Sequence, residues 1–140
     1  MGLFFYTKKG SIISTVDLPT TEIIEPKKKE GDVMAITLHL YYKGENGKAK
    51  QFMEEMEQSG TAAAIRAEKG NLKYDYFFPV SDPETVLLID SWENQAAIDA
   101  HHASPMMATV IALRDKYDLH MTVERYLSDD YPADDVFIRH

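Results

Sequence analysis

Two aromatic side chains with different chemistry stand nine residues apart near the middle of the chain. Trp92 is the only tryptophan, and it follows the short apolar run 86–89. His101 lies in the next stretch, which is helical from about residue 94 to 102. An indole can stack on a planar ring, and an imidazole is the side chain best matched to proton transfer near neutral pH. A strand that ends at the tryptophan and leads into a short helix would bring both rings to one cavity mouth.

Both residues also have ordinary structural interpretations. A tryptophan at a strand end is common in cores, and a histidine at a helix end can interact with the partial negative charge of the helix C-terminus. His102 is expected to matter less than His101. Adjacent histidines point in different directions on a helix, so the two do not easily ligate one ion. The sequence contains no H-E-x-x-H, P-loop or G-x-G-x-x-G motif, and no metal site is predicted.

Three residues on predicted strands are further candidates for contact with a substrate. His39 is on the less apolar side of its strand, where it could donate a hydrogen bond to a substrate or be a buried histidine with a partner of its own. Tyr74 and Tyr76 share one side of another strand. They could pack on an aromatic substrate and hydrogen-bond to it, or serve only core and subunit packing, because aromatic residues favour strands.

The elements that must position these residues follow from the apolar periodicity. Alternation and a short apolar run predict four strands, over residues 34–42, 72–78, 86 to about 92, and 119–126. Helical spacing predicts helices from residue 47 onward, from 94 to 102 and from 105 to 117. The resulting order, strand-helix-strand-strand-helix-strand, is that of an α+β ferredoxin-like plait with helices on one face of an antiparallel sheet.

Helix boundaries have their own signals. Asn46 is a possible cap of the first helix, which Gly60 should kink or break and Gly70 should end. Ser104 and Pro105 are typical of an N-cap followed by the first helical residue. Because the helices cover one face only, the other face would expose apolar side chains in a lone subunit, and this predicts a homodimer.

The segment around the tryptophan resembles a known family. The strand, Trp92-Glu93-Asn94, the run from Ala96 to His101 and Ala103-Ser104-Pro105 are similar to the antibiotic biosynthesis monooxygenase domain, as is the stretch 66–77. The resemblance covers roughly residues 34–126. It implies a dimeric α/β barrel and the oxidation of a small aromatic, quinol-type substrate with dioxygen and without a cofactor. It also implies that His101 is the base and Trp92 a pocket wall.

Two alternatives remain open at this point. Relatives of the same fold bind or degrade haem, which needs an axial ligand, usually a histidine on the helix after the tryptophan strand. Residues 105–117 contain no histidine, and Met106 stands where the family often has one. The other alternative is a non-catalytic dimeric module for binding or stress response, because this fold hosts many functions.

Composition sets the outer limits. The chain of 140 residues fits one domain over 33–127, with an N-terminal arm (1–32, a possible hairpin plus linker) and an acidic tail (128–140) that would fray or dock across a dimer. Its net charge of -8 argues against nucleic acid as a partner. No apolar stretch is long enough to span a membrane. The absence of cysteine is typical of a cytoplasmic protein.

Overall fold

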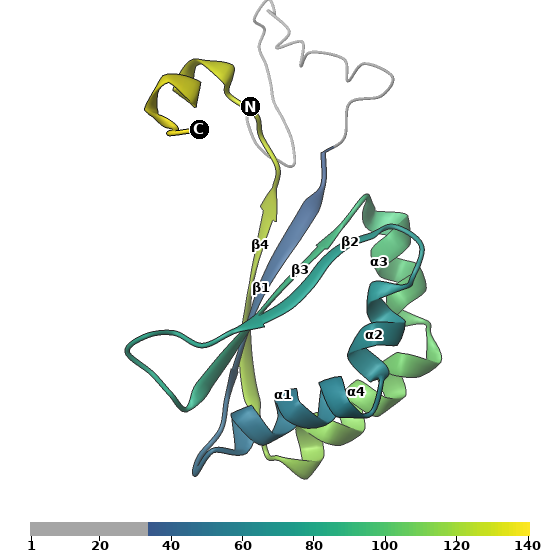
Figure 1. The fold of residues 1–140 in the computed structure, drawn as a ribbon. Coiled ribbons are helices and arrows are strands. Elements are labelled where there is room, and N and C mark those ends of the chain that lie inside the picture. Colours follow the sequence, from purple (N-terminus) through teal and green to yellow (C-terminus); the bar gives the residue numbers. More distant parts are fainter. Residues whose placement is uncertain (1–33) are drawn as a thin grey trace, which may run out of the picture. The chain divides into compact units, whose positions relative to one another are not determined.

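The computed structural model describes residues 34–140, which form one layer of strands and one layer of helices (Figure 1). The strands are β1 (Ile36–Lys43), β2 (Asn71–Phe77), β3 (Thr85–Trp92) and β4 (His120–Leu127). The helices are α1 (Lys48–Gln58), α2 (Thr61–Arg66), α3 (Gln95–His102) and α4 (Pro105–Lys116), followed by a short 3₁₀ helix, η1 (Pro132–Phe137). The hairpin expected in residues 1–32 lies outside the described residues. Among the described residues, no helix is long and apolar enough to cross a membrane.

The four strands form one antiparallel sheet in the order β2-β3-β1-β4. All four α-helices lie on one side of this sheet (Figure 1). Strand order and helix placement confirm the predicted ferredoxin-like plait. The central strands β3 and β1 are covered by helices, whereas β2 and β4 form the two edges.

The helical region before β2 breaks at the predicted glycine. Gly60 has φ 83° between α1 and α2, a backbone conformation that glycine adopts without the steric cost of a Cβ. The expected cap at Asn46 is wrong. Gly47 is the N-cap of α1, and the backbone N–H groups of Asn46 and Gly47 donate to the carboxylate of Glu84 at 2.8 and 3.0 Å.

The later helices begin where the sequence indicates. The Asn94 side chain accepts a hydrogen bond from the Ala97 N–H at 2.9 Å and so caps α3. Ser104 and Pro105 occupy the N-cap and first position of α4 as predicted. The Ser104 hydroxyl, however, donates back to the His101 carbonyl at 2.7 Å instead of capping the new helix. This bond ties the end of α3 to the start of α4, so the orientation of His101 depends on the turn between them.

Gly70 joins the helical layer to β2 at a tight contact, and this gives a stability prediction. Its φ is 86°, and a Cβ added there would lie 2.6 Å from the Cβ of Ala97. Gly70→Ala should therefore cost the left-handed backbone strain plus overpacking, about 2–4 kcal/mol of unfolding free energy. The control Gly47→Ala shares the positive φ but meets nothing within 4 Å, so only about 1 kcal/mol is expected. Urea denaturation measures both, and equal losses would contradict the packing argument.

The core lies between the helices and one face of the sheet. Alternate residues of β3 point into it, and the largest fully buried side chains are Trp92, Phe52, Met56, Ile65, Leu88 and Val86. The remaining residues of each strand, those between the core residues, point to the opposite face of the sheet. None of the α-helices described covers it, and Leu87 and Ile89 of the central strand are only half-buried there. Phe77 and Tyr126, on the edge strands of this face, are exposed.

Candidate functional site

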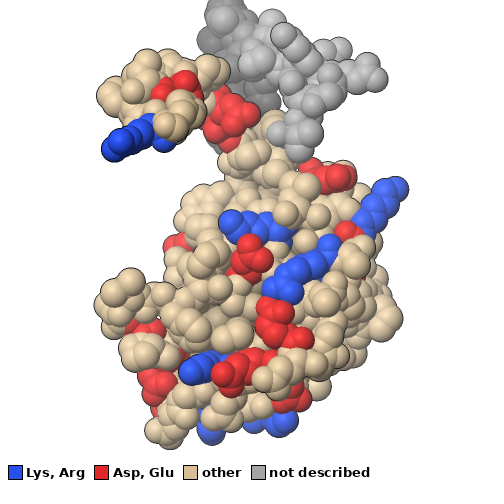
Figure 2. Space-filling model, in the orientation of Figure 1, with Lys and Arg blue, Asp and Glu red and all other residues tan. Residues whose placement is uncertain are grey.

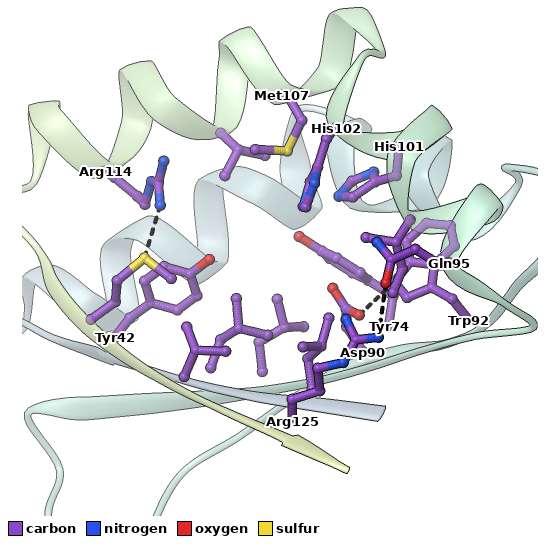
Figure 3. A pocket seen from close by; sticks show the side chains of 17 residues that line it. Tyr42, Tyr74, Asp90, Trp92, Gln95, His101, His102, Met107, Arg114 and Arg125 are labelled. Atoms are coloured by element: carbon purple, nitrogen blue, oxygen red, sulfur yellow. Dashed lines mark hydrogen bonds between the residues drawn. The ribbon is translucent and has the colours of Figure 1, made fainter. Parts of the chain in front are cut away.

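A cavity of about 270 Å³ lies between the sheet and the helices α3 and α4. Figure 3 shows that polar side chains gather mainly at one end, around His101, and that a second group lies at the other end, around Arg114. Leucine and valine side chains of the sheet form the floor between them. The volume is close to the lower limit of small-molecule sites, which suits a molecule of one or two rings.

The floor is built from rows of residues that face each other across the strands. One row contains three polar side chains and one leucine, in the order Arg125, Leu38, Asp90 and Tyr74. The next row contains Val123, Leu40 and Leu88 and is apolar. A third row, with Met121, Tyr42 and Val86, lies at the Arg114 end. Successive rows are two residues apart, or about 6.7 Å along the strands. The three rows therefore follow one another along the strands from the His101 end of the cavity to the Arg114 end.

His101 is fixed by two neighbours from other elements. Its Nδ1 lies 2.7 Å from Oε1 of Glu68, and its ring stacks on the Trp92 indole with centroids 4.7 Å apart and planes inclined by 28°. A carboxylate only accepts hydrogen bonds, so Nδ1 carries the proton and Nε2 keeps its lone pair. Burial lowers the pKa of His101, although the Glu68 carboxylate opposes this change. The imidazole is therefore neutral and oriented at neutral pH, as a general base requires.

The Trp92 indole has a different environment from the one expected. It is fully buried, and the His101 ring already occupies one of its faces. Its Nε1–H donates a hydrogen bond to Oδ1 of Asp90. Burial raises the pKa of Asp90 to about 7, against the lowering effect of the indole hydrogen bond, and the charge of Glu68 raises it further. Trp92 thus holds both His101 and a carboxyl group that titrates near neutral pH.

The structure brings together only some of the predicted site residues. Trp92, His101 and Tyr74 line the cavity, and so does His102, which was expected to matter less. Tyr76 does not line the cavity, but its hydroxyl donates a hydrogen bond to the hydroxyl of Tyr74, which does, at 3.5 Å. His39 lies on the opposite face of the sheet, where Nδ1 is 3.7 Å from Oε1 of Glu124 and the ring is 4.9 Å from that of Tyr126.

Sequence reasoning missed several residues of the site. Asp90 had a usable signal, because it shares the parity of Leu88 and Trp92, so that strand alternation alone places its carboxyl group on the core side. Glu68 had none, because it lies in a polar stretch of sequence where a charged residue usually points to solvent. Arg114 had a weak signal: it follows Met107 and Val110 at helical spacing, which places all three on one face of the helix. Their positions in the site follow only from how the helices pack on the sheet.

No group of three or more histidine, aspartate or glutamate residues within 34–140 is arranged to hold a metal ion. Two of the polar cavity residues are instead held by hydrogen bonds: His101 contacts Glu68, and the Trp92 N–H donates to Asp90. The arrangement can accept a proton, exclude water from an apolar space and hold a flat molecule beside an imidazole.

Fold and site together define a small α+β plait whose helix-covered cavity contains a carboxylate-oriented histidine beside a buried tryptophan. The family model described as "Antibiotic biosynthesis monooxygenase" matches residues 35–113. The chain belongs to this family, as its sequence resemblance implied.

Individual relatives support the same assignment. The chain is 31% identical over 67 residues to the Bacillus subtilis protein named "Putative monooxygenase YcnE", which covers 48% of this chain and 68% of that protein. A "putative antibiotic biosynthesis monooxygenase" from Caulobacter crescentus superposes with a TM-score of 0.62 at 15% identity, over 70% of this chain and 92% of that one. A protein of the same description from Deinococcus radiodurans gives 0.60 at 21% identity, over 69% and 94%. At these identities the two structures establish the fold alone.

Proposed function

We propose that this protein is a monooxygenase that oxidises a small aromatic, quinol-type substrate with dioxygen and without a resident cofactor. One observation carries the proposal: a cavity of about 270 Å³ is lined by a buried histidine whose Nδ1 is held by Glu68, which leaves Nε2 free to accept a proton. Membership of the monooxygenase family supports the reaction class.

The chemistry needs little from the protein because the substrate itself supplies the electrons. For a hydroquinone with an unsubstituted ring carbon, the balance is hydroquinone plus dioxygen giving hydroxyquinone plus water. His101 takes a hydroxyl proton, and the resulting anion gives one electron to dioxygen. The superoxide and the semiquinone radical then combine at a ring carbon to form a peroxide. His101 returns the proton to the outer oxygen of the peroxide. The O–O bond and the C–H bond of the same ring carbon then break, the hydroxide and this hydrogen leave as water, and a carbonyl remains.

The other cavity residues fit supporting roles in this reaction. The apolar floor formed by Leu40, Leu88 and Val123 keeps water from the charged intermediates. The Tyr74 hydroxyl is buried, and burial raises its pKa well above the ordinary value, so it stays protonated and can donate to a substrate oxygen. The small volume favours one or two rings over a porphyrin. Titration with haemin, read as a shifted Soret band of defined stoichiometry, would instead support the haem alternative.

An oxygen electrode with a panel of hydroquinones tests the function. We expect uptake above the autoxidation blank, saturating with substrate, and no oxygen released when catalase is added, because both oxygen atoms end in hydroxyquinone and water. Labelled dioxygen should place one atom in the product. If no hydroquinone is consumed faster than with heat-denatured protein, the proposal fails.

The same proposal includes a homodimer formed through the uncovered face of the sheet. Half-buried Leu87 and Ile89 and exposed Phe77 and Tyr126 on that face support it, since a lone subunit leaves this apolar surface in water. Light scattering after gel filtration should give twice the mass of the chain, and the mass of a single chain would contradict it.

A further inference from the structure

Arg114 lies at the end of the cavity away from His101 and has no counterion among the described residues, 34–140 (Figure 3). Its side chain extends from α4 and is half-buried. Its hydrogen bond, from Nη1, is to the sulfur of Met121 at 2.8 Å, and a thioether is only a weak acceptor. Within residues 34–140 no carboxylate oxygen lies within 4.0 Å of the guanidinium. Most of its donors are therefore without an acceptor in the described part of the chain.

The absence of a partner is not explained by a shortage of carboxylates. The chain has 23 acidic residues against 15 basic ones, and basic side chains lie beside acidic ones over the visible face of the described domain (Figure 2). Arg66 at the end of α2 pairs with Glu57, and Lys116, on the same helix as Arg114, pairs with Glu55 at 2.8 Å. A half-buried charge is costly unless an opposite charge or hydrogen bonds compensate it. For Arg114 no carboxylate within residues 34–140 supplies this compensation, and a bound anion in the cavity would supply it.

Tyr42 presents a second unsatisfied donor at the same end of the cavity. The residue is 2% exposed, its hydroxyl points into the cavity in Figure 3, and it makes no hydrogen bond to any residue of 34–140. Burial raises its pKa to about 12; the positive charge of Arg114 acts in the opposite direction, and the smaller effect of the Asp90 charge adds to the rise. The hydroxyl therefore stays protonated and can donate. A buried hydroxyl without a partner is unfavourable, so this group also needs an acceptor from a ligand.

We infer that Arg114 and Tyr42 form an anion subsite that binds a carboxylate of the substrate, which makes the substrate class a hydroxylated aromatic acid. The inference deepens the proposed function and rests on it for the orientation of the ring. The carboxylate lies at the Arg114 end because Asp90, when ionised, would repel it at the other end, whereas at Tyr42 the effect of the Arg114 charge on the pKa is larger than that of Asp90. The apolar row between the two ends contacts the ring, and the ring hydroxyl then lies on the side of His101.

The test compares two phenols that differ in charge and hardly in shape. The probes are 4-hydroxyphenylacetate and its neutral amide, 4-hydroxyphenylacetamide, neither of which is a hydroquinone. Binding is measured by calorimetry, with the fluorescence of the single tryptophan as a second signal. We expect the acid to bind about tenfold or more tightly than the amide, as is typical of a charge-assisted hydrogen bond.

Variants assign the preference to this subsite. Arg114→Gln should bring the affinity ratio of acid to amide close to one by weakening only the acid, and Arg114→Lys should keep part of it. Tyr42→Phe should lower the ratio about two- to fivefold. The matched control Lys116→Gln removes the same charge from the same helix, but outside the cavity, and should keep the wild-type ratio. Arg125→Gln tests the other arginine of the cavity, which is exposed and donates to Gln95 at 2.8 Å; it should also keep the ratio.

Equal affinity of the wild-type protein for acid and amide would overturn the inference, as would an Arg114→Gln variant that keeps the preference. If only Arg125→Gln loses the preference, the carboxylate binds at the His101 end of the cavity, and this result would also overturn the inference. If Arg114→Gln does not fold by circular dichroism, the lysine and Tyr42→Phe variants carry the same test. Binding is measured without turnover, so a protein that discriminates the acid but consumes no oxygen contradicts the proposed function and not the subsite.

Discussion

His101→Gln should lower kcat for the oxidation of the preferred hydroquinone by about 10²- to 10⁴-fold, the usual contribution of a positioned general base. Glutamine keeps a polar side chain of similar reach, but it cannot accept the substrate proton at neutral pH. The histidine is well placed to do so because Glu68 accepts from Nδ1 at 2.7 Å and leaves Nε2 unprotonated. Initial rates of oxygen uptake at saturating substrate measure the effect.

His102→Gln is the matched control. His102 lines the same cavity and its ring centroid is 5.7 Å from that of His101, but it is exposed and carries no comparable carboxylate contact within residues 34–140. We expect its kcat to stay within a few-fold of the wild type, on the order of a surface substitution. If His102→Gln loses activity and His101→Gln keeps it, the base is His102 and the assignment to His101 is wrong.

The pH profile gives an independent signature of the same residue. Burial lowers the pKa of His101 from 6.5, so the neutral, active form persists to more acid pH than for a free imidazole. The acid limb of kcat/KM should therefore lie below pH 6.5. Glu68→Gln removes the charge that holds this pKa up and should move the limb further toward acid. A limb that does not respond to Glu68→Gln would show that another group titrates.

Asp90→Asn should stabilise the fold above neutral pH. The pKa of Asp90 is raised from 3.8 to about 7, chiefly by burial. Between these values the folded state holds a proton that the unfolded state has lost, so wild-type stability falls as pH rises from about 4 to 7. The difference of about 3 pKa values corresponds to roughly 4 kcal/mol once the carboxyl group is ionised in both states. Asparagine stays neutral and still offers an oxygen to the Trp92 N–H, so the penalty disappears.

Urea denaturation of both proteins at several pH values between 4 and 9 tests this expectation. The difference in unfolding free energy should be smallest at the acid end and grow toward pH 8, with the variant the more stable. Asp115→Asn, which removes an exposed carboxylate from α4, is the control and should leave the pH dependence of stability unchanged. Parallel curves for wild type and Asp90→Asn would show that this carboxyl group titrates normally. A carboxyl group kept at such a cost is typical of a functional site.

The sequence by itself determined the elements and the direction of side chains within each of them. Alternation in β1 and β3 separates residues that face the helices, such as Leu38 and Trp92, from residues such as His39 that face away. Gly60 and Gly70 mark the ends of helical segments because both adopt positive φ. Such features depend on a residue and its nearest neighbours in the chain, so periodicity and backbone preference reveal them.

Only the tertiary structure decided which side of the sheet holds the cavity and which groups meet there. Glu68 reaches His101 across 33 positions of sequence, and Arg114 faces the cavity from a helix whose apolar spacing gave only a weak sign of it. These pairings depend on the rotation and distance of each helix over the sheet, which many residues set together through packing. No local pattern records that rotation, so the sequence indicated His101 as a candidate base and did not indicate that Glu68 would contact it or that Arg114 would line the same cavity.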